Sequence, residues 1–270
     1  MRFYKLLLSF SCAAFLAGCA SDIISPPHTE HPQLATAQLA RARGDIPQAI
    51  HDFREVITQD PKCEPAYIGL GFSLLDANAV PEAKLTFEKA ITLFPNSSDA
   101  YVGLGMVYLV MDQPENALDA FEKALCKNPR CPKALNGYGI ALDMLDDHEA
   151  AQANYRAAME LDPLAISYES NLALSMVLAG NEIEAIRILE RLSRSPNATP
   201  RIRQNLALAY GIAGDTSMAK KVGRMDLSDD MVVNNIAYIE AIRETKDFAG
   251  IIPKDHTIPL NETRPWQQPN

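Results

Sequence analysis

Apolar and small residues recur along the chain with the spacing of amphipathic helices, and the predicted helices come in pairs. Turn-forming residues such as Gly44-Asp45 separate the two helices of a pair. The pattern predicts helices over residues 34–43 and 47–59, 64–76 and 81–93, 99–111 and 114–127, and 133–145 and 149–161. Two looser pairs are expected within residues 166–194 and 201–225.

The pairs repeat every 34 residues, and the marker is an alanine in the second helix: Ala49, Ala83, Ala117, Ala151, Ala185 and Ala219. In the first four copies an aromatic residue follows four positions later and a proline twelve positions later. Small residues let helices approach closely, and proline ends a helix. This pattern resembles the tetratricopeptide repeat, which implies an all-α fold.

The resemblance implies a right-handed helical solenoid of about six helix pairs over residues 33–227. The period fails at Gly223, four positions after the last alanine. A further helix over residues 228–245, opened by Ser228, carries an apolar stripe and is expected to cap the open end of the solenoid. Residues 246–270 contain four prolines and the single Trp266, and are expected to form a flexible tail.

The N-terminus has the pattern of a bacterial lipoprotein signal peptide over residues 1–18. Two basic residues precede a short apolar run, and Leu16-Ala17-Gly18-Cys19 resembles a lipobox, which implies that Cys19 is acylated. An ordinary signal peptide with a chance cysteine is the alternative. Ala20 in place of aspartate implies the outer membrane, with the protein facing the periplasm. Residues 19–32 then form a tether between the lipid and the solenoid.

The charge of the chain argues against nucleic acid as a partner. The net charge is −9, and removal of residues 1–18 makes it −11 because that segment holds two basic residues and no acid. A nucleic-acid binder needs a basic face. Because an anionic membrane would repel the acidic body, membrane attachment is expected to depend on the lipid at Cys19.

Three cysteines remain beyond the lipidation site. Cys126 and Cys131 bracket four residues and are close enough in sequence to form a disulfide, with free buried cysteines as the alternative. Cys63 lies two repeats before Cys131, a separation of roughly 20 Å of stacked helices, which is beyond disulfide reach.

No motif for catalysis is present, so the protein is not expected to be an enzyme. The sequence lacks nucleophile-elbow, phosphate-loop and zinc-protease patterns, and it lacks four ligands at zinc spacing. No cofactor or metal is expected. An acidic run that includes Asp143, Asp146 and Asp147 is a candidate contact for a basic partner segment.

The first helix of each repeat is expected to line a concave groove that binds an amphipathic helix or an apolar peptide. The expected groove residues are mostly apolar: Ile68, Phe72, Val102, Met106, Leu109, Ile140, Met144 and Leu174. Asn171 and Asn205 occupy one repeat position, where earlier repeats have glycine, and their amides are expected to bond a peptide backbone. Arg201 is expected to pair with an acidic ligand.

The layout resembles the TadD family, the lipoproteins of the tight-adherence (Flp) pilus assembly system. The resemblance rests on the lipobox, the 34-residue repeats, and two stretches near the C-terminal end, residues 205–215 and 233–238. It implies a non-catalytic scaffold that binds the pilus secretin or other pilus-assembly components at the outer membrane. The alternative is a repeat lipoprotein that regulates peptidoglycan enzymes or another envelope assembly machine.

Overall fold

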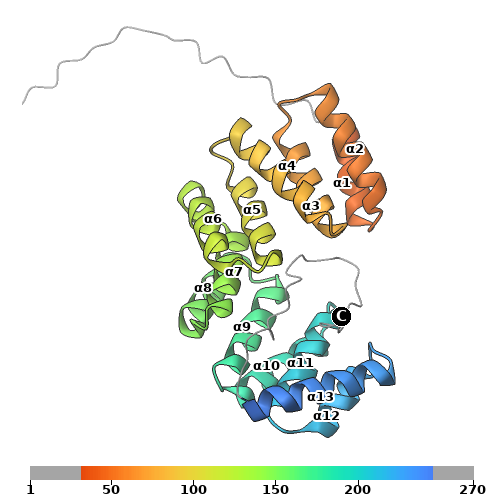
Figure 1. Ribbon diagram of the computed structural model, residues 1–270, viewed down its shortest axis with the longest axis vertical. Coiled ribbons are helices and arrows are strands. Elements are labelled where there is room, and N and C mark those ends of the chain that lie inside the picture. Colours follow the sequence, from red (N-terminus) through yellow and green to blue (C-terminus); the bar gives the residue numbers. More distant parts are fainter. Residues whose placement is uncertain (1–31, 246–270) are drawn as a thin grey trace, which may run out of the picture.

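The computed structural model describes residues 32–245, which hold thirteen helices and no strand (Figure 1). The predicted signal peptide, Cys19, the predicted tether before Pro32 and the predicted tail with Trp266 lie outside the described residues. The helices are α1 (Pro32–Ala42), α2 (Ile46–Gln59), α3 (Glu64–Asp76), α4 (Val80–Leu93), α5 (Ser98–Val110), α6 (Pro114–Lys127), α7 (Pro132–Met144), α8 (His148–Leu161), α9 (Ile166–Leu178), α10 (Glu182–Ser193), α11 (Pro200–Ile212), α12 (Thr216–Gly223) and α13 (Asp229–Thr245).

The helices stack as antiparallel pairs along a curved path, so that α1 and α2 lie at one end of an arc and α11 to α13 at the other (Figure 1). Each odd-numbered helix packs on its own partner and on the odd-numbered helix of the next pair. The prediction of an all-α solenoid of helix pairs with a final capping helix is therefore confirmed. Within residues 32–245, no helix is both long and apolar enough to cross a membrane.

The turn within each pair is built the same way in all six repeats. One residue per turn has a positive φ between 58° and 89°: Gly44, Asn78, Asp112, Asp146, Gly180 and Gly214. Only glycine, asparagine and aspartate enter this left-handed region readily, so the turn restricts the residue type. The next residue is the N-cap of the second helix, and in three repeats its side chain accepts from a backbone N–H of the first turn: Asp45, Asp147 and Asp215.

Glycine and phenylalanine interlock along the core. The ring of Phe87 is fully buried between Gly71 of its own repeat and Gly103 of the next. A Cβ at Gly71 would lie 2.5 Å from that ring, and a Cβ at Gly103 would lie 2.1 Å from it. Phe121 is held in the same way by the next two glycines of the series. The expected close approach of the first helix to its partner is thus confirmed, and a second glycine series serves the contact between repeats.

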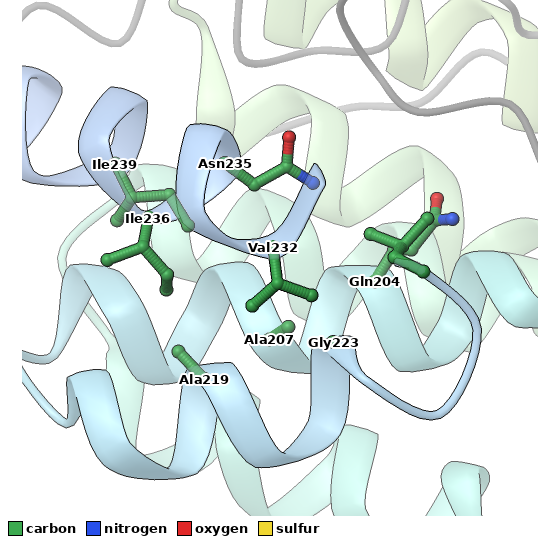
Figure 2. A pocket seen from close by; sticks show the side chains of 9 residues that line it. Gln204, Ala207, Ala219, Gly223, Val232, Asn235, Ile236 and Ile239 are labelled. Atoms are coloured by element: carbon green, nitrogen blue, oxygen red, sulfur yellow. The ribbon is translucent and has the colours of Figure 1, made fainter. Parts of the chain in front are cut away.

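Helix α13 covers the C-terminal end of the solenoid, where it packs on α11 and α12. Val232 and Ile236 point from α13 toward those helices, whereas the amide of Asn235 points away from them (Figure 2). Ile239 is 1% exposed, and a Cβ at Gly211 would lie 2.7 Å from its side chain. The helix stands where the first helix of a seventh repeat would stand, and no second helix follows it within the described residues.

Candidate protein-binding groove

Residues of the first four repeats line an open groove of about 360 Å³. Residues of α1, α2, α3, α5 and α7 line it: Gln38, Arg41, Ala42, Phe53, Glu64, Pro65, Ile68, Gly69, Phe72, Asp99 and Lys133. The groove therefore spans several repeats and does not belong to one helix pair. We refer to it below as the N-terminal groove.

An aromatic ring and a guanidinium group form one wall of the N-terminal groove. The Arg41 guanidinium carbon lies 5.4 Å from the centroid of the Phe72 ring, within the range of a cation–π contact. Its Nε donates to Asp76 Oδ2 at 2.8 Å. The Phe72 ring also packs edge-on against Phe87, at 5.1 Å between centroids. These contacts hold Phe72 in place while part of its surface stays open to solvent.

The remainder of the N-terminal groove combines an apolar floor with charges of both signs. Ile68 on the floor of the groove is half-buried. The ring of Phe53 packs directly against Gly69, where a Cβ would lie 2.2 Å from a ring carbon. Asp99 and Lys133 are exposed at the starts of α5 and α7. Such a surface can hold the apolar side chains of a peptide and pair with charges beside them.

The structure separates the predicted apolar groove residues and Arg201 into three groups. Ile68 and Phe72 line the N-terminal groove, and Met106, Met144 and Arg201 are partly exposed outside it. Four others belong to the hydrophobic core, with exposures of 5% or less: Val102, Leu109, Ile140 and Leu174. The expectation that these four contact a ligand is corrected, because neighbouring helices flank each first helix and bury the side chains that face them.

The two predicted asparagines are also buried, and each already has a partner within the fold. Asn171 Nδ2 donates to Asn136 Oδ1 at 2.8 Å, and Asn205 Nδ2 donates to Ser170 Oγ at 3.1 Å. Each bond joins residues 35 apart, so the pair links the first helices of consecutive repeats. These amides therefore hold the repeats together, and the expected bond to a peptide backbone is corrected.

Sequence reasoning missed the charged residues of the N-terminal groove. Arg41, Glu64, Asp99 and Lys133 were not predicted to line it, although Asp99 and Lys133 are one 34-residue period apart at the starts of their helices. That shared position was the available signal. Arg41 carried no such signal, because its place over Phe72 depends on how the first two repeats pack.

A buried carboxylate joins the fourth and fifth repeats. Asp143 is 4% exposed and accepts three hydrogen bonds: from Ser175 Oγ at 2.7 Å, from Tyr155 Oη at 2.8 Å, and from His148 Nδ1 at 2.9 Å. Burial raises the pKa of Asp143, although the three bonds act in the opposite direction. The bond to Asp143 raises the pKa of His148. Asp143 is thus part of the core, and its expected contact with a basic partner is corrected.

The cysteines Cys63, Cys126 and Cys131 are free thiols. Cys131 is buried next to the start of α7, whereas Cys126 is exposed on α6. Of the two alternatives for Cys126 and Cys131, a disulfide or free buried cysteines, the structure has free thiols, of which only Cys131 is buried. Burial also raises the pKa of the Cys63 thiol, which makes it less reactive than an exposed cysteine.

Comparison with known proteins agrees with this architecture. Family models described as tetratricopeptide repeat match residues 34–98, 98–131 and 132–163. Comparison with curated protein sequences finds no significant match.

Solved structures extend the similarity over about two thirds of the chain. A tetratricopeptide-repeat protein of Thermus thermophilus, TTC0263, is 20% identical over 66% of this chain and 96% of its own, with a TM-score of 0.60. PilW, described as a widely conserved type IV pilus biogenesis factor, is 19% identical over 70% of this chain and 88% of its own, with a TM-score of 0.60. The pilF protein of Pseudomonas aeruginosa is 23% identical over 70% and 89%, with a TM-score of 0.54.

At these identities the likeness shows the fold alone. The paired helices, the repeat matches and the solved structures together identify the chain as an all-α tetratricopeptide-repeat solenoid, a scaffold fold whose members bind protein partners.

Proposed function

We propose that the protein is a non-catalytic, lipid-anchored scaffold that faces the periplasm from the outer membrane and supports assembly of a tight-adherence (Flp) pilus or its secretin. The observation that carries the binding role is the N-terminal groove, where Phe72 is fixed by Arg41 and Phe87 yet stays partly open to solvent. Because the ring is already held in place, a peptide that binds against it costs little further side-chain entropy.

Two kinds of evidence support the pilus assignment. The lipobox and the stretches 205–215 and 233–238 resemble the TadD family in sequence. The solenoid has the same fold as PilW and pilF, although that fold also serves proteins with other tasks. The sequence resemblance therefore carries the assignment, and the fold is consistent with it.

Site-specific photo-crosslinking in cells tests the groove and its partner together. A photoreactive residue at Ile68 is expected to capture the secretin or another pilus-assembly component. The control is the same residue at Leu85, which is 66% exposed on α4 and outside the N-terminal groove. Equal capture from both positions would contradict the groove as the binding surface. Capture of cell-wall enzymes in place of pilus components would favour the alternative of a peptidoglycan-enzyme adaptor.

A Cys19→Ser variant tests the anchor separately. Loss of the thiol removes the acceptor for the lipid, so acyl labelling and outer-membrane fractionation are both expected to disappear. Cys126→Ser is the matched control, since that thiol is exposed on the solenoid and its loss leaves the lipobox intact. If the Cys19→Ser variant still fractionates with the outer membrane, the proposed lipid anchor is wrong.

A further inference from the structure

We propose that His51, Asp52 and Glu55 on α2 bind a divalent transition-metal ion such as Zn²⁺. One ligand atom from each of the three side chains lies within 4.8 Å of the other two. They come from a single helix, where Glu55 is four residues after His51 and three residues after Asp52, so each of the two can face Glu55 along α2. The proposal concerns a surface of the first repeat and does not depend on the function of the N-terminal groove.

The separation of two of these atoms, which also form an ion pair, matches that of two ligands on one ion. His51 Nε2 lies 3.5 Å from Glu55 Oε1. A good N–H···O hydrogen bond is shorter, at about 2.7–3.2 Å between heavy atoms. Two ligands that each lie about 2.1 Å from a tetrahedral zinc ion are separated by about 3.4 Å. The imidazole and the carboxylate therefore stand at the distance that one ion would require.

Asp52 supplies the independent observation, because it is buried and incompletely satisfied. The residue is only 9% exposed. Its Oδ1 accepts from Gln48 Nε2 at 2.7 Å, whereas its Oδ2 has no hydrogen-bond partner within residues 32–245. A buried carboxylate oxygen without a partner is costly, and a cation would offset that cost. Gln48 meanwhile fixes the orientation of the carboxylate, as partners of metal ligands commonly do.

The donor set selects the class of metal. One imidazole nitrogen with two carboxylate oxygens suits zinc, cobalt or nickel, whereas calcium and magnesium prefer oxygen ligands alone. Three protein ligands leave the remaining coordination positions to water. The sequence did not predict this site, because zinc motifs are recognised from the spacing of four ligands. The feature that indicates a site here, the unpartnered Oδ2 of Asp52, is visible only in the structure.

Titration of the full-length protein with Zn²⁺ and Co²⁺ tests the proposal. His51→Ala and Asp52→Asn are each expected to weaken zinc binding at this site by about tenfold or more. Gln48→Ala keeps all three ligands and is expected to weaken binding by about 10–100-fold through the misplaced carboxylate. His51 is exposed, so His51→Ala leaves the core intact, and thermal melting without metal verifies that each variant is folded.

The control is Asp119→Asn, which removes an exposed carboxylate on α6 that pairs with Lys123 at 2.6 Å. This variant is expected to bind zinc as the wild type does. The cobalt spectrum is expected to show nitrogen and oxygen ligation without thiolate charge-transfer bands. Zinc binding that is unchanged in both His51→Ala and Asp52→Asn would overturn the proposal, and so would thiolate bands, which would assign the ion to the cysteines.

Discussion

At the scale of single residues, buried aromatic rings pack so closely against glycines that a Cβ at those glycines would clash. Phe87 is the clearest example, because glycines from two repeats lie against its ring. Truncation of this ring to alanine would cost about 3–5 kcal/mol. The glycines that face it cost helix propensity, and the buried ring offsets that cost.

Gly103→Ala is expected to destabilise the protein. In a helix this change normally stabilises by about 0.5–1 kcal/mol. Here the new Cβ would lie 2.1 Å from a Phe87 ring carbon, so we expect a net loss of about 1–3 kcal/mol. Chemical denaturation measures the loss.

The double variant Gly103→Ala with Phe87→Leu identifies the cause. A smaller side chain relieves the clash, so the two changes together are expected to cost less than the sum of the single changes. Additive costs would mean that the ring of Phe87 is not what excludes the methyl group.

Stability is expected to fall as the pH rises above 6.5, because the pKa of His148 is raised in the folded state. The bond to Asp143 raises the pKa of His148 above 6.5, and the charges of Asp146 and Asp147 act in the same direction. The folded state therefore binds this proton more tightly than the unfolded chain does. The stabilisation is fully present below the unfolded-state pKa of 6.5 and is lost as the pH rises through the folded-state pKa.

Urea denaturation over a pH series that begins below 6.5 checks this prediction. The wild type is expected to lose more unfolding free energy than a His148→Gln variant, which has no imidazole to titrate. Tyr155 continues to donate to Asp143 across this range, since burial holds its pKa well above 10. If the unfolding free energy of the two proteins fell equally with pH, His148 would not be the cause of the pH dependence.

At the scale of elements, α13 covers the last repeat and ends the stack of helices. The side chains of Asn171 and Asn205, which are one 34-residue period apart, each donate a hydrogen bond to a polar residue 35 positions earlier. One period after Asn205, the same repeat position holds Ile239. Gln204, its counterpart 35 positions earlier, has a buried Nε2 without a hydrogen-bond partner among the described residues. The series of amide bonds thus ends at α13, where an apolar contact with Gly211 takes its place.

Ile239→Ala is expected to destabilise the C-terminal end by about 2–5 kcal/mol, because it removes a side chain that is only 1% exposed. The matched control on the same helix is Val233→Ala, where the side chain is 58% exposed and a change within about 0.5 kcal/mol is expected. Thermal unfolding of the two variants measures the difference. Similar melting temperatures would show that α13 does not act as a cap.

At the scale of the whole molecule, the solenoid is a one-dimensional stack. Each pair of helices packs on its immediate neighbours, and contacts between α1 and α13 are absent from the described residues. Stability then resembles a sum of repeat and interface contributions, so a local change affects mainly the adjoining repeats. The N-terminal groove and the α13 cap are accordingly expected to respond independently.

Hydrogen exchange in the Ile239→Ala variant tests that independence. Faster exchange is expected in α11 to α13, with little change in α1 to α4, because the two regions share no packed interface within residues 32–245. A Phe53→Ala variant, which empties a core position between the first repeats, is the reciprocal control. Uniformly faster exchange along the chain in either variant would mean that the solenoid unfolds as one unit.

The sequence by itself determined the fold, because the 34-residue period appears in residues that serve local purposes. The alanines, the aromatic residues that follow them and the helix-ending prolines all act within one repeat or its neighbour. Helix bounds in the first four repeats agree with the expected ones to within about two residues, as where both give 64–76 for α3.

Only the tertiary structure decided which side chains face the concave surface. Phe72 and Ile140 occupy the same repeat position, two periods apart, yet Phe72 lines the N-terminal groove and Ile140 is 4% exposed in the core. The first helix of a repeat inside the stack packs against helices on both sides. Its apolar pattern therefore predicts that side chains are buried, but it does not distinguish burial in the core from exposure in a groove. The place of Arg41 over Phe72, and the unpartnered oxygen of Asp52, likewise follow from packing that no periodicity encodes.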